Sequence, residues 1–509
     1  MDWKRIVTSA ITAFIISVIV FLNLNDFGIT WDEPIYFARA DHYFVWLKTP
    51  RLGTAQDVFR VTTADYHPPF RKLVGGLTHE IFVNQFHLID NTRGYRISAL
   101  LFVFPFVLLF TYIAIGQFGY CIGILTPYVF SFMPHVFFLT PLMTTDYAMA
   151  VMWFTAVVVL VKGFKNSYWL PVTAVLSGFV FLTKLYGVLI ILPLVGYWIW
   201  KQRNILFKAK KMQVKMKTMS SILFVLMGCA ATYVVFWPWL WSSPIVHFVE
   251  YLMFQLTDAG VPVAVFGQTY THAPYWYTLV MLLLTTPIFV LVFFAIGILF
   301  IVKKGKEWDW VFLLNALFPL VFFSLPGVYR YDGIRLFLIS FPFICLVAAR
   351  GIQSTVKMFT KQVQPYVVCV IFIFWIGTVY TSVIRIHPWE SSYYNELVGG
   401  VSGASQLGLE TEFWGNAYLG VLPWMNANKK DMMCAYPTTN PFYYYQAMGQ
   451  IEGGVVFNAG RDVCKYMVVL MRQGMFSPFV QHMVASDKPV YQLLLQGVPL
   501  VGIYDIEGK

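Results

Sequence analysis

The chain of 509 residues carries a small set of ionisable side chains whose types suit chemistry on a hydroxyl group. The first two, Asp32 and Glu33, stand next to each other in the stretch ITWDEPIYFARADHYF. A carboxylate can take the proton of an attacking hydroxyl group, and a cation can stabilise an anionic leaving group. The other members of the set are His67, Asp146, Lys184 and Arg335.

Most of these residues also have an explanation that requires no chemistry. Asp32 and Glu33 precede a helical pattern, PIYFARADHYFVWL, where anions cap the first turn and oppose the helix dipole. Asp146, in TTDYAMA, likewise starts an apolar run next to typical capping residues. Arg335 and Lys184 border apolar runs, where basic side chains snorkel, although Lys184 is costly there unless it meets an anion. Because all of these residues are expected at one face of a membrane, we favour a common site.

His67 lies in the segment DYHPPFRKLVGGL of the same loop. The proline that follows it disfavours a helical backbone, so we expect an extended conformation at His67. Arg71 and Lys72 are adequately explained as basic residues at the level of the lipid headgroups. That explanation accounts less well for an imidazole held rigidly at the membrane surface.

The composition is that of an integral membrane protein. Hydrophobic residues make up 58% of the chain, charged residues 12%, and the mean hydropathy is +0.64. A spanning helix needs about 20 apolar residues, and we identify about eleven candidate runs, some of them shorter. These runs lie near 6–23, 97–116, 121–139, 147–161, 168–182, 186–200, 220–238, 275–302, 309–325, 335–349 and 365–383.

Basic residues in short loops predict the orientation of the chain. They gather in 201–217, 303–306 and 350–361, which we therefore expect on the cytoplasmic side, together with the N-terminus. The first apolar run then acts as a retained anchor, and residues 24–95 and 384–509 lie outside. The net charge of +11 is a topology signal, and no basic soluble region supports nucleic-acid binding. A bacterial inner membrane with a periplasmic site fits this pattern.

The sequence predicts two domains. Residues 1–383 form a polytopic α-helical membrane domain, and 384–509 form a small exterior α/β domain. Within the latter, GVVFNA, CKYMVVLM and VPLVGIYDI resemble strands, and YYYQAMGQIEGG resembles a helix ended by glycine. Cys434 and Cys464 lie in this domain, where an exterior location permits a disulfide without requiring one.

Several motifs resemble the GT-C superfamily of membrane glycosyltransferases, in particular its family-39-like branch of protein O-mannosyltransferases and lipid A aminoarabinose transferases. The resemblance rests on their order along the chain. The motifs are WDEPIYFA, HPPFRKLVGG, TTDYAMA, GFVFLTKLYGVLIILP, WPWLW, YDGIRLFLISFPFICLVAARG and SYYNELVGGVSGASQLGLETEFWG.

The resemblance implies an inverting transfer of a sugar from a polyprenyl-phosphate donor to a hydroxyl acceptor on the exterior face. Asp32 would be the general base, and Glu33 would support it by hydrogen bonding or by holding a divalent metal. Asp146 would be a second acidic residue at the reaction centre. His67, where some relatives carry lysine, would contact the donor phosphate together with Lys184 and Arg335.

Two alternatives remain at this stage. A catalytically degenerate relative would keep the fold without the chemistry. A transporter or flippase of lipid-linked sugars would also use charges, but it predicts polar residues at mid-membrane and inverted repeats, and we find neither. The sequence does not identify the sugar, or whether the acceptor is a lipid, a glycan or a protein.

Overall fold

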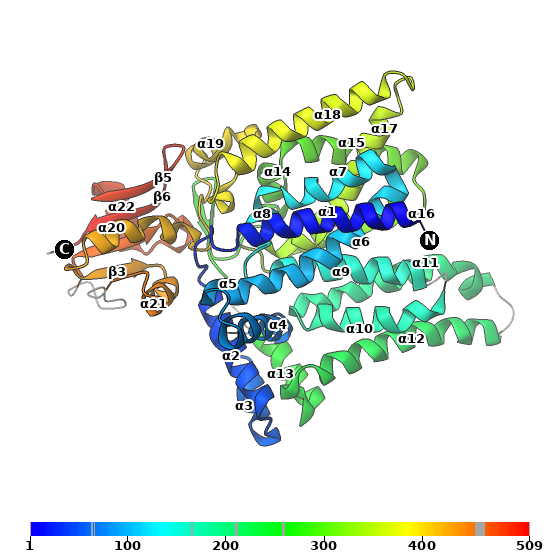
Figure 1. Cartoon of the computed structure of the whole chain (residues 1–509), viewed down its shortest axis with the longest axis horizontal. Coiled ribbons are helices and arrows are strands. Elements are labelled where there is room, and N and C mark those ends of the chain that lie inside the picture. Colours follow the sequence, from blue (N-terminus) through cyan, green and yellow to red (C-terminus); the bar gives the residue numbers. More distant parts are fainter. Residues whose placement is uncertain are drawn as a thin grey trace.

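The computed structural model consists of a long helical bundle and a smaller C-terminal domain that covers one end of it (Figure 1). It describes residues 2–62, 65, 67–163, 166–208, 212–256, 260–452 and 464–507, without the side chains of 52 and 204–218. The predicted strand GVVFNA and part of the basic segment 201–217 lie outside the described residues. The N-terminus and the connection between the last two bundle helices lie at the end away from the C-terminal domain (Figure 1).

Each predicted apolar run coincides with one helix or two consecutive helices of the bundle. The main helices are α1 (Trp3–Leu22), α6 (Leu100–Phe118), α7 (Tyr120–Ser131), α9 (Thr145–Gly163), α10 (Leu170–Phe181), α11 (Ile191–Lys208), α12 (Met212–Val235), α14 (Tyr277–Thr285), α15 (Ile288–Lys304), α16 (Glu307–Phe322), α17 (Phe341–Val356) and α18 (Gln364–Val379).

Six helical stretches of the described chain are long and apolar enough to cross a membrane, or seven if one bent pair counts as a span. The others are shorter apolar helices, such as Tyr120–Ser131 and Ser167–Phe181. The run 275–302 is that bent pair: α14 and α15 meet at 116°, with Pro287 at the break. The protein is therefore a polytopic helical membrane protein, as predicted, although many runs are not complete spans by themselves.

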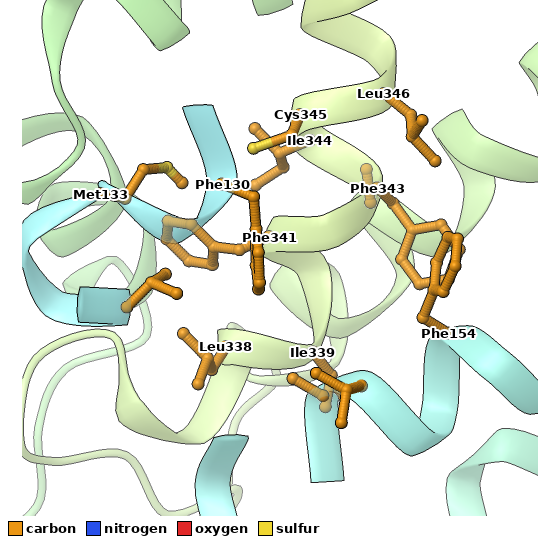
Figure 2. Packing of buried hydrophobic residues seen from close by; sticks show 14 of the residues in the cluster. Phe130, Met133, Phe154, Leu338, Ile339, Phe341, Phe343, Ile344, Cys345 and Leu346 are labelled. Atoms are coloured by element: carbon orange, nitrogen blue, oxygen red, sulfur yellow. The ribbon is translucent and has the colours of Figure 1, made fainter. Parts of the chain in front are cut away.

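The core of the bundle lies around α9 and α17, whose residues are mostly buried. Figure 2 shows this packing, in which Phe154 of α9 lies beside Phe343 of α17, with ring centroids 5.3 Å apart. Helices α15 and α17 approach each other closely. A Cβ atom added to Gly297 would lie 2.0 Å from the backbone oxygen of Val347, so only glycine permits this contact.

The first loop, residues 24–95, folds into helices at the end of the bundle that is next to the C-terminal domain (Figure 1). They are α2 (Glu33–Lys48), α3 (Ala55–Phe59), α4 (Phe70–His79) and α5 (Asn91–Arg96). The prediction of a helix through PIYFARADHYFVWL is confirmed. This helix packs against α4 and buries Tyr36, Tyr43 and Trp46, so its aromatic residues serve packing within the protein.

The C-terminal domain is a four-stranded sheet with short helices. Its strands are β3 (Met433–Tyr436), β4 (Tyr466–Leu470), β5 (Tyr491–Leu495) and β6 (Val498–Asp505), in the order β3-β4-β6-β5. β3 and β4 are parallel, and the other pairs are antiparallel. The helices are α20 (Leu422–Ala427), α21 (Asn440–Ala447) and α22 (Pro478–Ser486). The strands predicted in CKYMVVLM and VPLVGIYDI are confirmed, and a disulfide joins Cys434 to Cys464.

Candidate active site

Arg335 stands at the centre of the candidate site. It begins the short helix η7 (Arg335–Ser340), directly before α17, and only 7% of its surface is exposed. Its Nε atom donates to Asp146 over 3.0 Å, its Nη1 atom to Asp332 over 2.6 Å, and its Nη2 atom to Asp32 over 2.8 Å. The guanidinium carbon also lies 3.4 Å from the ring centroid of Trp414. Three carboxylates and an aromatic face thus hold one cation in a single orientation.

Asp146 and Lys184 form the buried side of the site. Asp146 lies in the first turn of α9, and its Oδ1 atom accepts a hydrogen bond from Lys184 Nζ over 2.5 Å. Lys184 occupies the extended residue between α10 and η5 (Leu185–Ile190). Both side chains are almost completely buried. Asp146 therefore provides the anion that offsets the cost of burying the ammonium group of Lys184 in an apolar segment.

Asp32 forms the open side of the site. Its Oδ2 atom accepts hydrogen bonds from Arg335 and, over 3.1 Å, from the indole nitrogen of Trp414. Its side chain is 25% exposed, whereas that of Asp146 is 0% exposed. Burial raises the pKa of Asp32 above its ordinary value of 3.8, and the positive charge of Arg335 opposes this shift. A carboxylate with a raised pKa is a better proton acceptor.

The capping explanation fails for Asp32, because its side chain makes no capping hydrogen bond to α2. At Asp146, both carboxylate oxygens accept hydrogen bonds from side chains, one from Lys184 and one from Arg335. These two acidic residues therefore belong to a cluster that joins distant parts of the chain.

Glu33 points away from this cluster. It is fully buried, and its Oε1 and Oε2 atoms accept hydrogen bonds from Arg96 over 2.8 and 2.6 Å. The backbone nitrogens of Thr30 and Met143 also donate to it. Its oxygens are thus used for fixing the loop that carries Asp32, and they do not suit a metal ion. Among the described residues, no group of three or more His, Cys, Asp or Glu side chains could hold one.

His67 and Lys184 both line a cavity of about 440 Å³. Burial lowers the pKa of His67 well below its ordinary value of 6.5, and the charges of Lys184, Lys72 and Arg335 add to this effect. The imidazole is consequently neutral at pH 7. Lys72 holds the segment in place by donating to the backbone oxygen of His67 and to Asp65.

The cavity is lined mainly by apolar and aromatic side chains. They come from η5, from α13 (Pro244–Leu256), from the last residue of α16 and from the segment that follows α16. Examples are Leu189, Leu252, Phe322 and Tyr329. A mostly apolar cavity of this size with a few polar groups is the usual form of a small-molecule binding site. Lys184 and His67 supply two of these polar groups.

Three further residues of the cluster were not assigned a role from the sequence. Asp332 had a signal, since it lies three residues before Arg335 in YDGIR. Trp414 belongs to ETEFWG, a segment that carries the family resemblance. Arg472 follows strand β4, and no pattern around it indicates that it reaches Asp332 over 2.6 Å.

Comparisons with known proteins agree with this fold. Residues 66–231, which carry His67, Asp146 and Lys184, match the family described as dolichyl-phosphate-mannose-protein mannosyltransferase. No curated protein sequence matches the chain.

Among solved structures, ArnT from Cupriavidus metallidurans bound to undecaprenyl phosphate matches with a TM-score of 0.51 and 10% identity, over 98% of each chain. The apo oligosaccharyltransferase of Archaeoglobus fulgidus matches with a TM-score of 0.51 and 11% identity, over 92% of this chain and 70% of its own. Both are GT-C glycosyltransferases. The fold is therefore that of the GT-C superfamily, as the sequence motifs predicted.

Proposed function

We propose that this protein is a glycosyltransferase that moves a sugar from a polyprenyl-phosphate donor to a hydroxyl acceptor. The observation that carries the proposal is the convergence of Asp32, Asp146, Lys184 and Arg335 beside an apolar cavity that Lys184 lines. The cavity suits a lipid tail, the cations suit a phosphate, and a partly exposed carboxylate suits a proton acceptor. The match to the mannosyltransferase family and the undecaprenyl phosphate bound by ArnT support the same donor class.

Asp32 acts as the general base. It takes the proton of the acceptor hydroxyl while the hydroxyl oxygen forms its bond to the anomeric carbon. The bond from that carbon to the phosphate oxygen breaks, and its electron pair leaves with the phosphate. Among the described carboxylates of the cluster, Asp32 is partly exposed, whereas Asp146 and Asp332 are buried against cations. With one exposed base and no second exposed carboxylate to act as nucleophile, we infer a direct displacement that inverts the anomeric centre.

Arg335 and Lys184 receive the developing charge of the phosphate. The Nη2 edge of the guanidinium, which faces Asp32, can donate to a phosphate oxygen, and the ammonium adds a point charge from the buried side. Asp146 holds both cations in place, since it bonds to each of them. His67, neutral at pH 7, contributes as a hydrogen-bond partner of the phosphate rather than as a charge.

We place the reaction on the exterior face. The disulfide between Cys434 and Cys464 supports an oxidising compartment for the C-terminal domain, which covers the site. The N-terminus, with Lys4 and Arg5, lies at the other end of the bundle, in agreement with the positive-inside rule (Figure 1). A bacterial inner membrane with its active site on the periplasmic side is the setting that fits both observations.

Replacing the base tests the proposal. Asp32→Asn keeps the side-chain volume and removes the proton acceptor, so transfer should fall about 100- to 10,000-fold. Asp57→Asn is the matched control, because Asp57 lies exposed in the same loop. The assay is complementation of cells that lack the gene, with mass spectrometry of their surface glycans, and binding of undecaprenyl phosphate by the purified variants. Near-normal transfer by Asp32→Asn would overturn the proposal.

A further inference from the structure

Arg472 is a fully buried arginine that the C-terminal domain contributes to the candidate site. It lies just beyond strand β4, and its exposed fraction is 0%. Burying a guanidinium costs a large desolvation free energy, which is offset only when an anion and hydrogen-bond acceptors inside the protein bind it. Its contacts therefore indicate what it does.

These contacts fall on the immediate neighbours of the proposed catalytic residues. The Nη2 atom of Arg472 donates to Oδ1 of Asp332 over 2.6 Å, and Asp332 in turn bonds to Arg335. The Nη1 atom donates to the backbone oxygen of Phe413, the residue before Trp414. The guanidinium carbon lies 4.7 Å from the ring centroid of Trp31, the residue before Asp32.

Asp332 is the bridge between the two arginines. One of its oxygens binds Arg472 and the other binds Arg335, so it holds two guanidinium groups at fixed positions. Its φ angle is +55°, in the left-handed region that aspartate tolerates better than most other residues. The aspartate is therefore held in place from both sides.

We propose that Arg472 is a positioning residue for the donor site: it acts through Asp332 to orient Arg335 towards the phosphate. With Nε of Arg335 held by Asp146 and Nη1 held by Asp332, the Nη2 edge is directed to the open side, where Asp32 lies. Docking of the C-terminal domain thereby completes the phosphate site. This inference rests on the proposed function and adds to it a requirement for the C-terminal domain.

The alternative is that Arg472 merely ties the C-terminal domain to the bundle. In that case, replacing Arg472 would lower the unfolding temperature. The effect of Asp332→Asn on donor affinity would then be the same with and without Arg472. The two roles are separated by a double-mutant cycle of Arg472→Gln and Asp332→Asn in the full-length protein, with Kd for undecaprenyl phosphate and the unfolding temperature as readouts. Lys465→Gln is the control, because Lys465 pairs with Asp431 at the surface of the same sheet.

We expect each single variant to weaken undecaprenyl phosphate binding about 10- to 100-fold, and the double variant to be no weaker than the poorer single one. Lys465→Gln should bind like the wild type. If Arg472→Gln does not fold, Arg472→Lys, which keeps the charge and one donor, should show an intermediate loss that disappears in the Asp332→Asn background.

Wild-type affinity in a folded Arg472 variant, or losses that add in the double variant, would overturn the positioning role while leaving the proposed function intact. A wild-type protein that does not bind undecaprenyl phosphate would overturn the proposed function, and the positioning role with it.

Discussion

Truncation of Arg335 should remove most of the affinity for the lipid-phosphate donor. In Arg335→Ala, Asp146 keeps its bond to Lys184 and Asp332 keeps its bond to Arg472. Asp32 keeps only the neutral indole N–H of Trp414. Two of the three carboxylates thus retain a cation, so the protein should still fold, and the loss falls on the open side where the phosphate binds.

The magnitude follows from the bonds that the phosphate loses. Removing one member of a close, buried charge pair costs about 2–5 kcal/mol. The cavity and Lys184 remain, so we take about 3–4 kcal/mol, which corresponds to roughly a 100- to 1,000-fold increase in Kd. Arg335→Lys keeps the charge but cannot reproduce the planar fork of donors, and it should lose about tenfold.

Native mass spectrometry of the purified variants with undecaprenyl phosphate measures these affinities directly. Arg330→Ala is a matched control, because Arg330 lies five residues earlier and its guanidinium donates to the backbone oxygens of Val328 and Leu325. It should bind the lipid phosphate within about twofold of the wild type. Arg335→Ala with wild-type affinity, or Arg330→Ala with an equal loss, would refute the reasoning.

Two further predictions concern stability and sidedness. Burial raises the pKa of Glu410 to about 7 from its ordinary value of 4.5. Between these two pH values, the folded protein keeps a proton on Glu410 that the unfolded chain releases. The resulting stability is complete below about pH 4.5 and is lost as the pH rises through 7, by at most about 3 kcal/mol. Melting temperatures at pH 5 and pH 8 should therefore differ in the wild type and converge in Glu410→Gln; an unchanged pH dependence in the variant would contradict this. In a background without the free cysteines, Val45→Cys should react with an impermeant thiol reagent on intact spheroplasts, and Met358→Cys only after permeabilisation. Both side chains are exposed, so the reverse pattern would place the site in the cytoplasm.

The sequence indicated three charged residues of the cluster better than it indicated the residues that hold them in place. Asp32, Asp146 and Arg335 stood out because charged residues are rare in this chain and each lies beside an apolar run. Their assembly depended on the family resemblance, since no periodicity relates residues that far apart. The interpretation of Glu33 as a possible metal ligand is not favoured by its bonds to Arg96. Nothing near Arg96 in NTRGYRISAL distinguishes it from a basic residue at the membrane surface.

The bend between α14 and α15 had a signal that a search for apolar runs overlooks. Hydropathy is continuous over 275–302, so the run looked like one span. Pro287 interrupts it, and proline cannot supply the backbone N–H that a continuous helix needs. The short helices of the bundle have a similar cause: tertiary packing, rather than the thickness of a bilayer, decides where an apolar helix ends.

The charge cluster has equal numbers of acidic and basic groups: Asp32, Asp146 and Asp332 face Lys184, Arg335 and Arg472. It therefore offers no surplus attraction to a passing anion, and a phosphate can enter only by ion exchange. Asp32 is the carboxylate that a phosphate can displace from Arg335, because its side chain is 25% exposed, whereas that of Asp332 is 3% exposed. Free phosphate must break the pair between Asp32 and Arg335 before it can bind Arg335, and the cost of breaking this pair reduces its affinity.

A lipid-linked phosphate differs because its tail adds apolar burial to the exchange. When it takes the Nη2 edge of Arg335, the carboxylate of Asp32 is released from its cation. In the proposed reaction, the base becomes available only with the donor in place. The order of substrate binding then depends on this one ion pair, which also keeps an empty site from activating water.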